Sequence, residues 1–452
     1  TLTLTGVSSE NVWQLSKVKF CVARDVIEKI NPANPNQYEY MGEWVDMEVT
    51  TEILEVGGGE SEELTIRRTS HGPIISGVYG PLDEVDPDAL DFPEEYAIAL
   101  RWTGLEPGTS LIAPLIALNT ASNFEEFREG ALLFDVPSQN MLYADTEGNI
   151  GYQVPGLIPI RTEGDGRYPV PGWTGASEWE GYIAKDDLPW VLNPESGWIV
   201  TANNAVIDES YPYLLTYDWS YGYRAQRAVD LLVSNLGMGI EGHQIMQFDS
   251  FDLNADFALP YVFDAVEASG IDLSDREQAA LDALTAWDLQ NFSDSTGAAV
   301  WNGTWRHMMA RTLHDEFPEE IHPPGGSTLF EAFRLWLQDA DHPFWDDVTT
   351  SQTVEDRDTI LVAAFVDAVE ELSDLMGSNI DDWSWGRIHT ATFRNESLGE
   401  SGIGLIEDRF NRGPYPASGS KSVVNAVGWD PTEGYEVDWL PSMRMIVDLD
   451  DF

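Results

Sequence analysis

The hydrophobic pattern of this chain changes its period along the sequence, and that change restricts the fold to a few classes. Between residues 26 and 222, apolar and polar residues alternate in short runs that are typical of strands. One such run extends from Val45 to Val49, and Gly57-Gly58-Gly59 interrupts the pattern as a turn does. Between residues 223 and 380, apolar residues recur every three or four positions, as in amphipathic helices. Strands and helices in separate blocks predict an α+β fold.

Individual elements follow from the same patterns and from capping residues. Residues 41–80 predict hairpins, and Asn123 is a suitable N-cap for a short helix that begins at Phe124. The segment from Pro81 to Pro93 is acidic and interrupted by prolines, which predicts a surface loop. Strands are expected at Tyr96–Trp102, Met141–Val154 and Trp439–Asp448, and helices at Tyr223–Leu236, Arg276–Leu289, Thr304–His314, Ser327–Leu337 and Asp356–Met376.

Charge limits the partners and the setting of the protein. The 452 residues include 24 Lys and Arg against 78 Asp and Glu, which gives a formal net charge of -54. Such self-repulsion is tolerable where salt screens it, since the Debye length falls to roughly 3 Å near 1 M salt. We therefore expect an acidic protein from a halophilic setting, with a mildly acidic secreted enzyme as the alternative. Nucleic acid and anionic membrane surfaces are disfavoured as partners.

Cysteine content and hydropathy leave the compartment open. A single cysteine, Cys21, excludes an internal disulfide and a thiolate metal cluster. No run approaches the roughly 20 apolar residues that span a bilayer, and no leader pattern is visible at Thr1. An extracellular or periplasm-like location and the high-salt cytoplasm of a halophile both remain consistent with the sequence.

The strongest chemical signal lies between Gly197 and Arg227. An apolar, strand-like run ends in the adjacent carboxamides of Asn203 and Asn204, and Arg224 follows in the next helical pattern. Neutral amide donors backed by a fixed cation suit the stabilisation of an oxyanion. Asn203 as an ordinary turn residue, and Arg224 as a surface residue at a helix start, are the structural alternatives.

Other short motifs occur along the chain, and their shared order is more specific than any one of them. They are Arg68-Thr69-Ser70-His71-Gly72-Pro73, Leu100-Arg101-Trp102-Thr103-Gly104, Pro137-Ser138-Gln139-Asn140, Tyr143-Ala144-Asp145, Pro169-Val170-Pro171-Gly172-Trp173, Asn193-Pro194-Glu195-Ser196-Gly197, Trp383-Ser384-Trp385-Gly386-Arg387-Ile388-His389, Asn411-Arg412-Gly413-Pro414-Tyr415-Pro416 and Ser442-Met443-Arg444.

In this order the motifs resemble those of the penicillin acylase family of N-terminal nucleophile hydrolases, from about Val26 to the C-terminus. The resemblance implies a four-layer αββα sandwich with a largely helical insertion. The corresponding division of the chain is an atypical N-terminal segment at 1–25, the strand-rich part of the core at 26–222, a mainly helical insertion at 223–380, and a C-terminal return to the core sheet at 381–452.

The same resemblance implies amide hydrolysis by a chain that cleaves itself and exposes a nucleophile. The α-amino group of the new terminus titrates near 7.7 to 8.0 and can serve as the base. Asn203 matches the family's oxyanion asparagine, and Arg224 matches the arginine that orients it. No cofactor is required for this chemistry.

The nucleophile is where the chain departs from the family. The family's larger chain opens with Ser-Asn-Asn-Trp and continues through a long pocket region, whereas Ser9-Glu10-Asn11-Val12-Trp13 is only a faint echo of that opening. Thr1 is chemically acceptable as an alternative, and Ser9 would require cleavage before it. A third interpretation places the serine on sequence not present here, which would make this polypeptide the C-terminal portion of the enzyme.

A structural calcium ion is implied by the resemblance, with ligands near Asp25 and near the backbone of Gly166. Zinc is disfavoured, because His307 and His314 lack the glutamate of an H-E-x-x-H motif. We interpret these two histidines as surface or half-buried residues. His71 and His389 are expected to pack or to form hydrogen bonds.

The predicted function is that of a penicillin acylase-like amidase that acts on a small acyl amide with an apolar acyl group. Family members accept β-lactam amides in antibiotic biosynthetic processes, or N-acyl-homoserine lactones. The expected partner is the N-terminal chain of the same precursor. The rival hypothesis is a catalytically inactive homologue, and a glycosidase, suggested by abundant carboxylates and tryptophans, is a weaker one.

Overall fold

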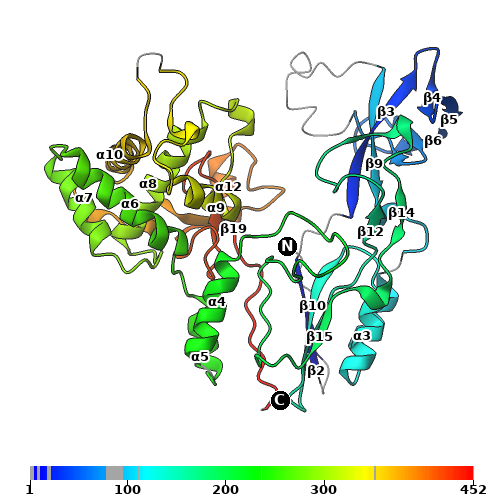
Figure 1. The fold of residues 1–452 in the computed structure, drawn as a ribbon, viewed down its shortest axis with the longest axis horizontal. Helices are drawn as coiled ribbons and strands as arrows, with labels where there is room; N and C mark the ends of the chain where they lie inside the picture. Colours follow the sequence, from blue (N-terminus) through cyan, green and yellow to red (C-terminus); the bar gives the residue numbers. More distant parts are fainter. Residues whose placement is uncertain are drawn as a thin grey trace. The chain divides into compact units, whose positions relative to one another are not determined.

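The computed structural model describes residues 5–7, 11–17, 22–77, 95–109, 111–235, 237–350 and 353–450. These form two compact units, each with its own hydrophobic core. The strand-rich unit contains the described residues up to Trp219 together with 449–450, and the helical unit contains those of 220–448. Figure 1 shows the contrast between their secondary structures. The expected loop at Pro81–Pro93 and Cys21 lie outside the described residues.

The first sheet of the strand-rich unit is antiparallel, with the strand order β1-β2-β10-β11-β15. Helix α3 packs on it through Phe124 and Phe127, whose rings lie 5.5 and 5.1 Å from that of Tyr143. Gly151 is required on β11, since a Cβ there would lie 2.2 Å from Phe124. The elements are β1 (Thr5–Val7), β2 (Asn11–Lys17), β10 (Gln139–Asp145), β11 (Ile150–Gln153), β15 (Trp190–Leu192), α2 (Ile112–Thr120) and α3 (Phe124–Leu132).

Further strands of this unit form a second sheet, a three-stranded hairpin sheet and a two-stranded ladder. In the second sheet β3 is central, pairing with β9 and β4 antiparallel and with β13 parallel. The elements are β3 (Ala23–Asn31), β4 (Asn34–Tyr40), β5 (Glu43–Asp46), β9 (Tyr96–Trp102) and β13 (Val170–Pro171); β6 (Glu48–Leu54), β7 (Glu62–Thr69) and β8 (Gly72–Pro73); β12 (Pro159–Arg161) and β14 (Trp179–Tyr182); and the 3₁₀ turns η1 (Thr103–Leu105), η2 (Gly172–Thr174) and η3 (Lys185–Asp187).

The helical unit is built on a core of aromatic and aliphatic side chains from α6, α8, α9 and α10, which Figure 1 shows grouped together with α7. Helices α8 and α10 pack closely because Gly303 carries no side chain; a Cβ there would lie 3.1 Å from Leu372 and 3.3 Å from Ala368. The helices are α4 (Tyr223–Ser234), α5 (Ile240–Gln247), α6 (Leu253–Ser269), α7 (Asp275–Thr285), α8 (Thr296–Leu313), α9 (Ser327–Trp336), α10 (Arg357–Met376), α11 (Trp385–Ile388) and α12 (Gly404–Phe410), with 3₁₀ turns η4 (Glu319–Ile321), η5 (Pro343–Trp345) and η6 (Ile380–Asp382).

Capping residues explain where several helices begin. Asn123 accepts a hydrogen bond from the Glu126 amide, which confirms the predicted cap of α3. Ser274 and Glu277 form a reciprocal capping box at α7, and Asp252 caps α6. These local signals fix the helix starts without reference to the rest of the fold.

The C-terminal part of the helical unit contains short strands: β16 (Thr390–Phe393) pairs with β17 (Arg412–Pro416), and β18 (Gly428–Trp429) with β19 (Val437–Trp439). The predicted strand at Trp439–Asp448 is wrong, because β19 ends at Trp439. Two residues later, Pro441 has no backbone N–H to donate to a neighbouring strand. The described strands of 381–452 pair with one another. The predicted return of this part of the chain to the core sheet therefore stays a prediction. None of the helices that the structure describes is long and apolar enough to cross a membrane.

Candidate functional site

The segment that carries Asn203 leaves the first sheet at the end of β15. The strand-like run predicted at Gly197–Asn204 is wrong. After β15 ends at Leu192, the chain forms turns and extended segments that do not pair in any of the described sheets. Left-handed backbone at Asn193 (φ 49°) and Gly197 (φ 76°) explains the interruption, because strand geometry requires negative φ. The segment is therefore an irregular loop.

This loop is anchored on a buried core. Ile199 and Val206 pack against the cluster that contains Tyr152, Ile158 and Leu215. Two tyrosines add polar anchors: the Tyr211 hydroxyl donates to the Asp187 carbonyl at 3.0 Å, and the Tyr213 hydroxyl to Asp187 Oδ2 at 3.3 Å. Burial, with the Asp187 charge as the next contribution, raises the pKa of Tyr211 to about 12. A loop fixed at both ends can hold a side chain in one position without belonging to a strand.

Asn203 is half-buried and adopts a left-handed backbone conformation, with φ of 67°. Non-glycine residues are uncommon in this region, asparagine is the most tolerant of them, and such positions concentrate at functional sites. Its neighbour Asn204 serves the local turn: Oδ1 accepts from the Ala202 amide at 3.0 Å, and Nδ2 donates to the Ala205 carbonyl at 3.0 Å. Asn204 therefore has a structural role in this turn, and the role predicted for Asn203 stays a prediction.

Arg224 lies at the second residue of α4, directly after Gly222 and Tyr223, so the expected helix start is confirmed. It is half-buried, and burial lowers the pKa of its guanidinium. Asn203 belongs to the strand-rich unit and Arg224 to the helical unit. The orienting interaction expected between them stays a prediction. Thr1 and Ser9, the two nucleophile candidates, lie outside the described residues.

The surroundings of Asp25 and Gly166 do not fit a calcium ion. Strand alternation places Asp25 on the opposite face of β3 from Arg24 and Val26, which are buried. A Cβ on Gly166 would lie 3.1 Å from Arg161 Nη2, so a cation already stands beside this backbone. The described residues also contain no group of three His, Cys, Asp or Glu side chains placed to hold a metal.

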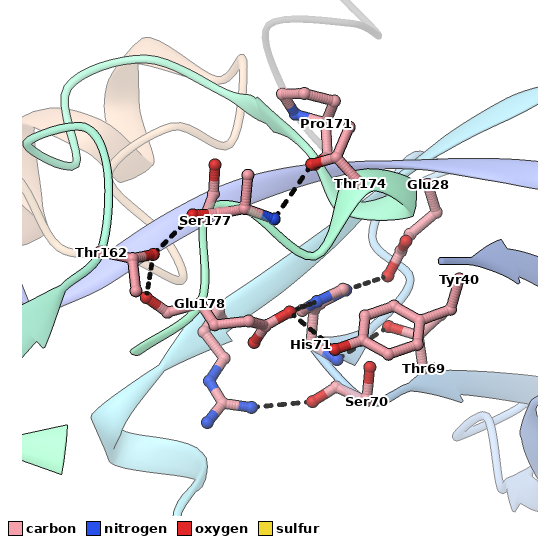
Figure 2. A network of polar contacts seen from close by, with 12 residues as sticks. Glu28, Tyr40, Thr69, Ser70, His71, Thr162, Pro171, Thr174, Ser177 and Glu178 are labelled. Carbon is pink, nitrogen blue, oxygen red and sulfur yellow. Dashed lines mark hydrogen bonds and ion pairs between the residues drawn. The ribbon is translucent and has the colours of Figure 1, made fainter. Parts of the chain in front are cut away.

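Figure 2 shows a network of polar contacts that includes His71, whose predicted hydrogen-bonding role is confirmed. Nδ1 lies 2.7 Å from Glu28 Oε1, and Nε2 lies 2.9 Å from Glu178 Oε1. Burial alone would lower the pKa of His71, but the hydrogen bonds and charges of the two glutamates outweigh it and raise the pKa. The imidazolium thus joins β3, the turn before β8 and the start of β14.

The turn that carries His71 depends on glycine. Gly72 has φ of 133°, and a Cβ there would lie 2.0 Å from the Leu100 carbonyl oxygen on β9. Thr69 Oγ1 accepts from the His71 amide at 3.0 Å and fixes the turn. The sequence motif identified His71 but not its partners. One signal was detectable: Glu28 lies two residues after Val26 on β3, so strand alternation places this glutamate on the same buried face.

His307 and His314 are both half-buried, as expected. His307 Nε2 lies 2.9 Å from Glu371 Oε2, and His314 stacks on His322 with ring centroids 3.7 Å apart. These contacts are those of structural histidines on α8 and its neighbours.

Comparison with known proteins places these features in a family. The penicillin amidase family model matches residues 6–452. An acyl-homoserine lactone acylase, QuiP, of Pseudomonas aeruginosa is 31% identical over 439 residues, covering 90% of this chain and 51% of that protein. Penicillin G acylase of Escherichia coli is 29% identical over 389 residues, covering 79% and 43%.

A solved structure, the thermostable penicillin G acylase from Alcaligenes faecalis, superposes with a TM-score of 0.65 and 26% identity, covering 84% of this chain and 70% of that one. The α+β class and the N-terminal nucleophile hydrolase fold are thereby confirmed. The chain spans about half the length of the curated relatives that it matches, from 43% to 54% among them.

Proposed function

This chain belongs to the penicillin amidase family, and we propose that it provides the oxyanion-binding part of an acylase that hydrolyses small acyl amides. The observation that carries the proposal is Asn203, held at φ 67° on a loop anchored to a buried core. A carboxamide fixed in this way can donate a hydrogen bond to developing negative charge without reorganising during the reaction.

In the proposed reaction, the hydroxyl of an N-terminal serine or threonine attacks the amide carbonyl, and the α-amino group of the same residue takes the hydroxyl proton. The oxyanion accepts a hydrogen bond from the Asn203 carboxamide. The C–N bond then breaks as the leaving amine gains the proton, which leaves an acyl-enzyme. Water cleaves this ester, releasing the acid and restoring the hydroxyl.

The proposed substrates are amides with an apolar acyl group. N-acyl-homoserine lactones are the first choice, because QuiP of Pseudomonas aeruginosa, which is 31% identical to this chain, is named as an acyl-homoserine lactone acylase. A β-lactam amide such as penicillin G is the second, in view of the penicillin G acylases among the relatives, and would connect the protein to antibiotic biosynthesis. The proposed partner is the N-terminal chain of the same precursor.

The test is an acylase assay on the natural protein, with released homoserine lactone or 6-aminopenicillanic acid measured in molar KCl. Asn203→Gly removes the carboxamide while tolerating the left-handed backbone, and should lower kcat by roughly 10²–10³. Asn193→Gly is the matched control: Asn193 also has positive φ, but its side chain bonds Ile150 and Asn149 and has no role in the proposed reaction.

Intact-mass analysis of the same preparation identifies the terminal residue. A processed serine or threonine terminus with activity that depends on Asn203 supports the enzyme. An unprocessed protein that leaves both substrates untouched would establish the rival, a catalytically inactive homologue.

A further inference from the structure

The segment from Thr162 to Glu178 lies along β3 and is attached to it at several points. Its two ends are joined by a hydrogen bond from the Thr162 amide to the Glu178 carbonyl at 3.1 Å. In its middle, β13 pairs in parallel with β3 at Val170 and Val26. The backbone at Gly172 approaches β3 so closely that a Cβ would lie 2.4 Å from Glu28 Oε2.

Arg24 joins both ends of this segment to β3. Its Nη1 donates to the Ser177 carbonyl at 2.7 Å, and its Nη2 donates to the Glu163 carbonyl at 2.7 Å. Only 2% of Arg24 is exposed. A planar guanidinium is suited to this task, because its donors point in fixed and divergent directions.

The electrostatics of the segment are arranged around this buried cation. Burial lowers the pKa of Arg24, while the charges of Asp165 and Glu178 oppose that effect. Asp165 is itself engaged by Arg167, which donates from Nε at 2.9 Å and from Nη2 at 2.6 Å. A second guanidinium, that of Arg161, stands beside Gly166.

We propose that Arg24 holds the 162–178 segment on β3 where a metal ion would otherwise be needed, so that the strand-rich unit folds without calcium. Calcium takes 6–8 oxygen ligands at roughly 2.3–2.6 Å. The carbonyl oxygens of Glu163 and Ser177 already accept hydrogen bonds from a cation, and Arg161 would repel a second one. The inference is independent of the acylase activity.

The first experiment uses the unmodified full chain. Melting temperatures are measured in molar KCl with EDTA, with millimolar Ca²⁺ and with millimolar Mg²⁺, and calcium is quantified by mass spectrometry after dialysis. We expect equal melting temperatures in the three conditions and no stoichiometric calcium. One retained calcium per chain, or a melting temperature that falls in EDTA and is restored by Ca²⁺ but not by Mg²⁺, overturns the proposal.

The second experiment compares variants. Arg24→Met should lower the melting temperature by more than roughly 5 °C, since it removes the buried guanidinium that donates to the part-buried carbonyls of Glu163 and Ser177. Arg24→Lys keeps the charge but cannot bridge both carbonyls, and should recover only a minor part of the loss. Arg167→Met removes an exposed ion pair from the same segment and should shift the melting temperature by less than roughly 2 °C.

Should Arg24→Met fail to fold, hydrogen exchange of peptides 162–178 in the unmodified protein replaces it, with and without EDTA. Unchanged protection supports the guanidinium attachment. Loss of protection in EDTA contradicts it.

Discussion

Each unit of the molecule buries one histidine, and the two are held in opposite ways. In the strand-rich unit, His71 is 5% exposed and lies between Glu28 and Glu178, which raise its pKa against the effect of burial. In the helical unit, His389 is fully buried and stacks on Trp385 at 4.4 Å between ring centroids, and burial lowers its pKa to about 4.

The difference follows from what surrounds each ring. Around His71 the elements supply two carboxylates, so protonation satisfies both of them. Around His389 they supply the Trp385 ring and the backbone carbonyls of Tyr435, 2.8 Å from Nδ1, and Val427, whose hydrogen bonds do not offset the effect of burial on the pKa of the ring. The same residue type therefore stabilises one unit as a cation and the other as a neutral group. Stability should respond to pH in opposite directions in the two units.

The largest expected effect comes from removing the cation. His71→Leu leaves Glu28, which is fully buried, and Glu178 without their shared donor, and should destabilise the strand-rich unit by about 3–5 kcal/mol. Denaturant unfolding at pH 7, followed by tryptophan fluorescence and hydrogen exchange, measures the loss. Adding Glu28→Gln should recover part of it, because only one carboxylate then needs to be charged.

His307→Leu in the helical unit is the matched control for that change. Its partner Glu371 keeps hydrogen bonds from Tyr435 and Arg306, so the loss should be about 1 kcal/mol. Equal losses of unfolding free energy for the two variants would show that the ion pairs of His71 contribute no more than the half-buried pair of His307 with Glu371.

The second effect is acid destabilisation of the helical unit. Since the folded pKa of His389 is about 4 against an ordinary value of 6.5, its contribution is complete above pH 6.5 and is lost as pH falls towards 4. The loss should reach about 3 kcal/mol. Exchange of peptides around residues 385–389 between pH 7 and 4.5 measures it, and His389→Asn should flatten the slope.

Glu371 does not obscure that measurement. Burial would raise the pKa of Glu371, but hydrogen bonds from His307 and Tyr435 and the charge of Arg306 lower it to about 2. Its contribution is therefore lost only as pH falls below 4.5. A helical unit whose protection is constant from pH 7 to 4.5 would contradict the neutral assignment of His389.

Alkaline destabilisation of the strand-rich unit should be smaller, because Glu178 is partly exposed and solvent screens its charge. The folded pKa of His71 is raised, so its contribution is complete below pH 6.5 and declines as pH rises through the folded value. Tyr40, which donates to Glu178 at 3.4 Å, stays protonated in this range, since burial raises its pKa. Exchange of peptides 67–75 across pH 6–9 tests the decline; a flat profile, or one that Glu178→Gln leaves unchanged, would refute it.

Sequence patterns predicted elements best where local signals were complete. The strand Tyr96–Trp102 was predicted residue for residue, and Asn123 identified a helix start through its own hydrogen bond. Helix α8 begins at Thr296, eight positions before the predicted Thr304, because it is buried on nearly every face and so lacks an amphipathic period. Helix α6 is not among the predicted helices; it contains Pro260, whose ring points to solvent.

The part of the site that could be predicted from the sequence is the part that local motifs and their order along the chain identify. The motif around Asn203 could be read from sequence, but its left-handed backbone depends on the anchored loop. His71 lies 43 residues from Glu28 and 107 from Glu178, so no local pattern joins the three. The calcium prediction likewise treated Asp25 as a ligand, whereas the pleat of β3 turns Arg24 towards the segment that contains Gly166.

The smallest specific effect should be that of salt, which is expected to act equally on the two units. With a formal charge of -54, molar KCl should relieve surface repulsion and raise the melting temperature by at least roughly 2–4 °C, about 1 kcal/mol for units of this size. Buried pairs such as His71 with Glu28 are screened much less, so the pH slopes should persist in high salt. If salt instead abolished the pH dependence of stability in both units and left the melting temperature unchanged, that pH dependence would come from surface charges and not from His71 and His389.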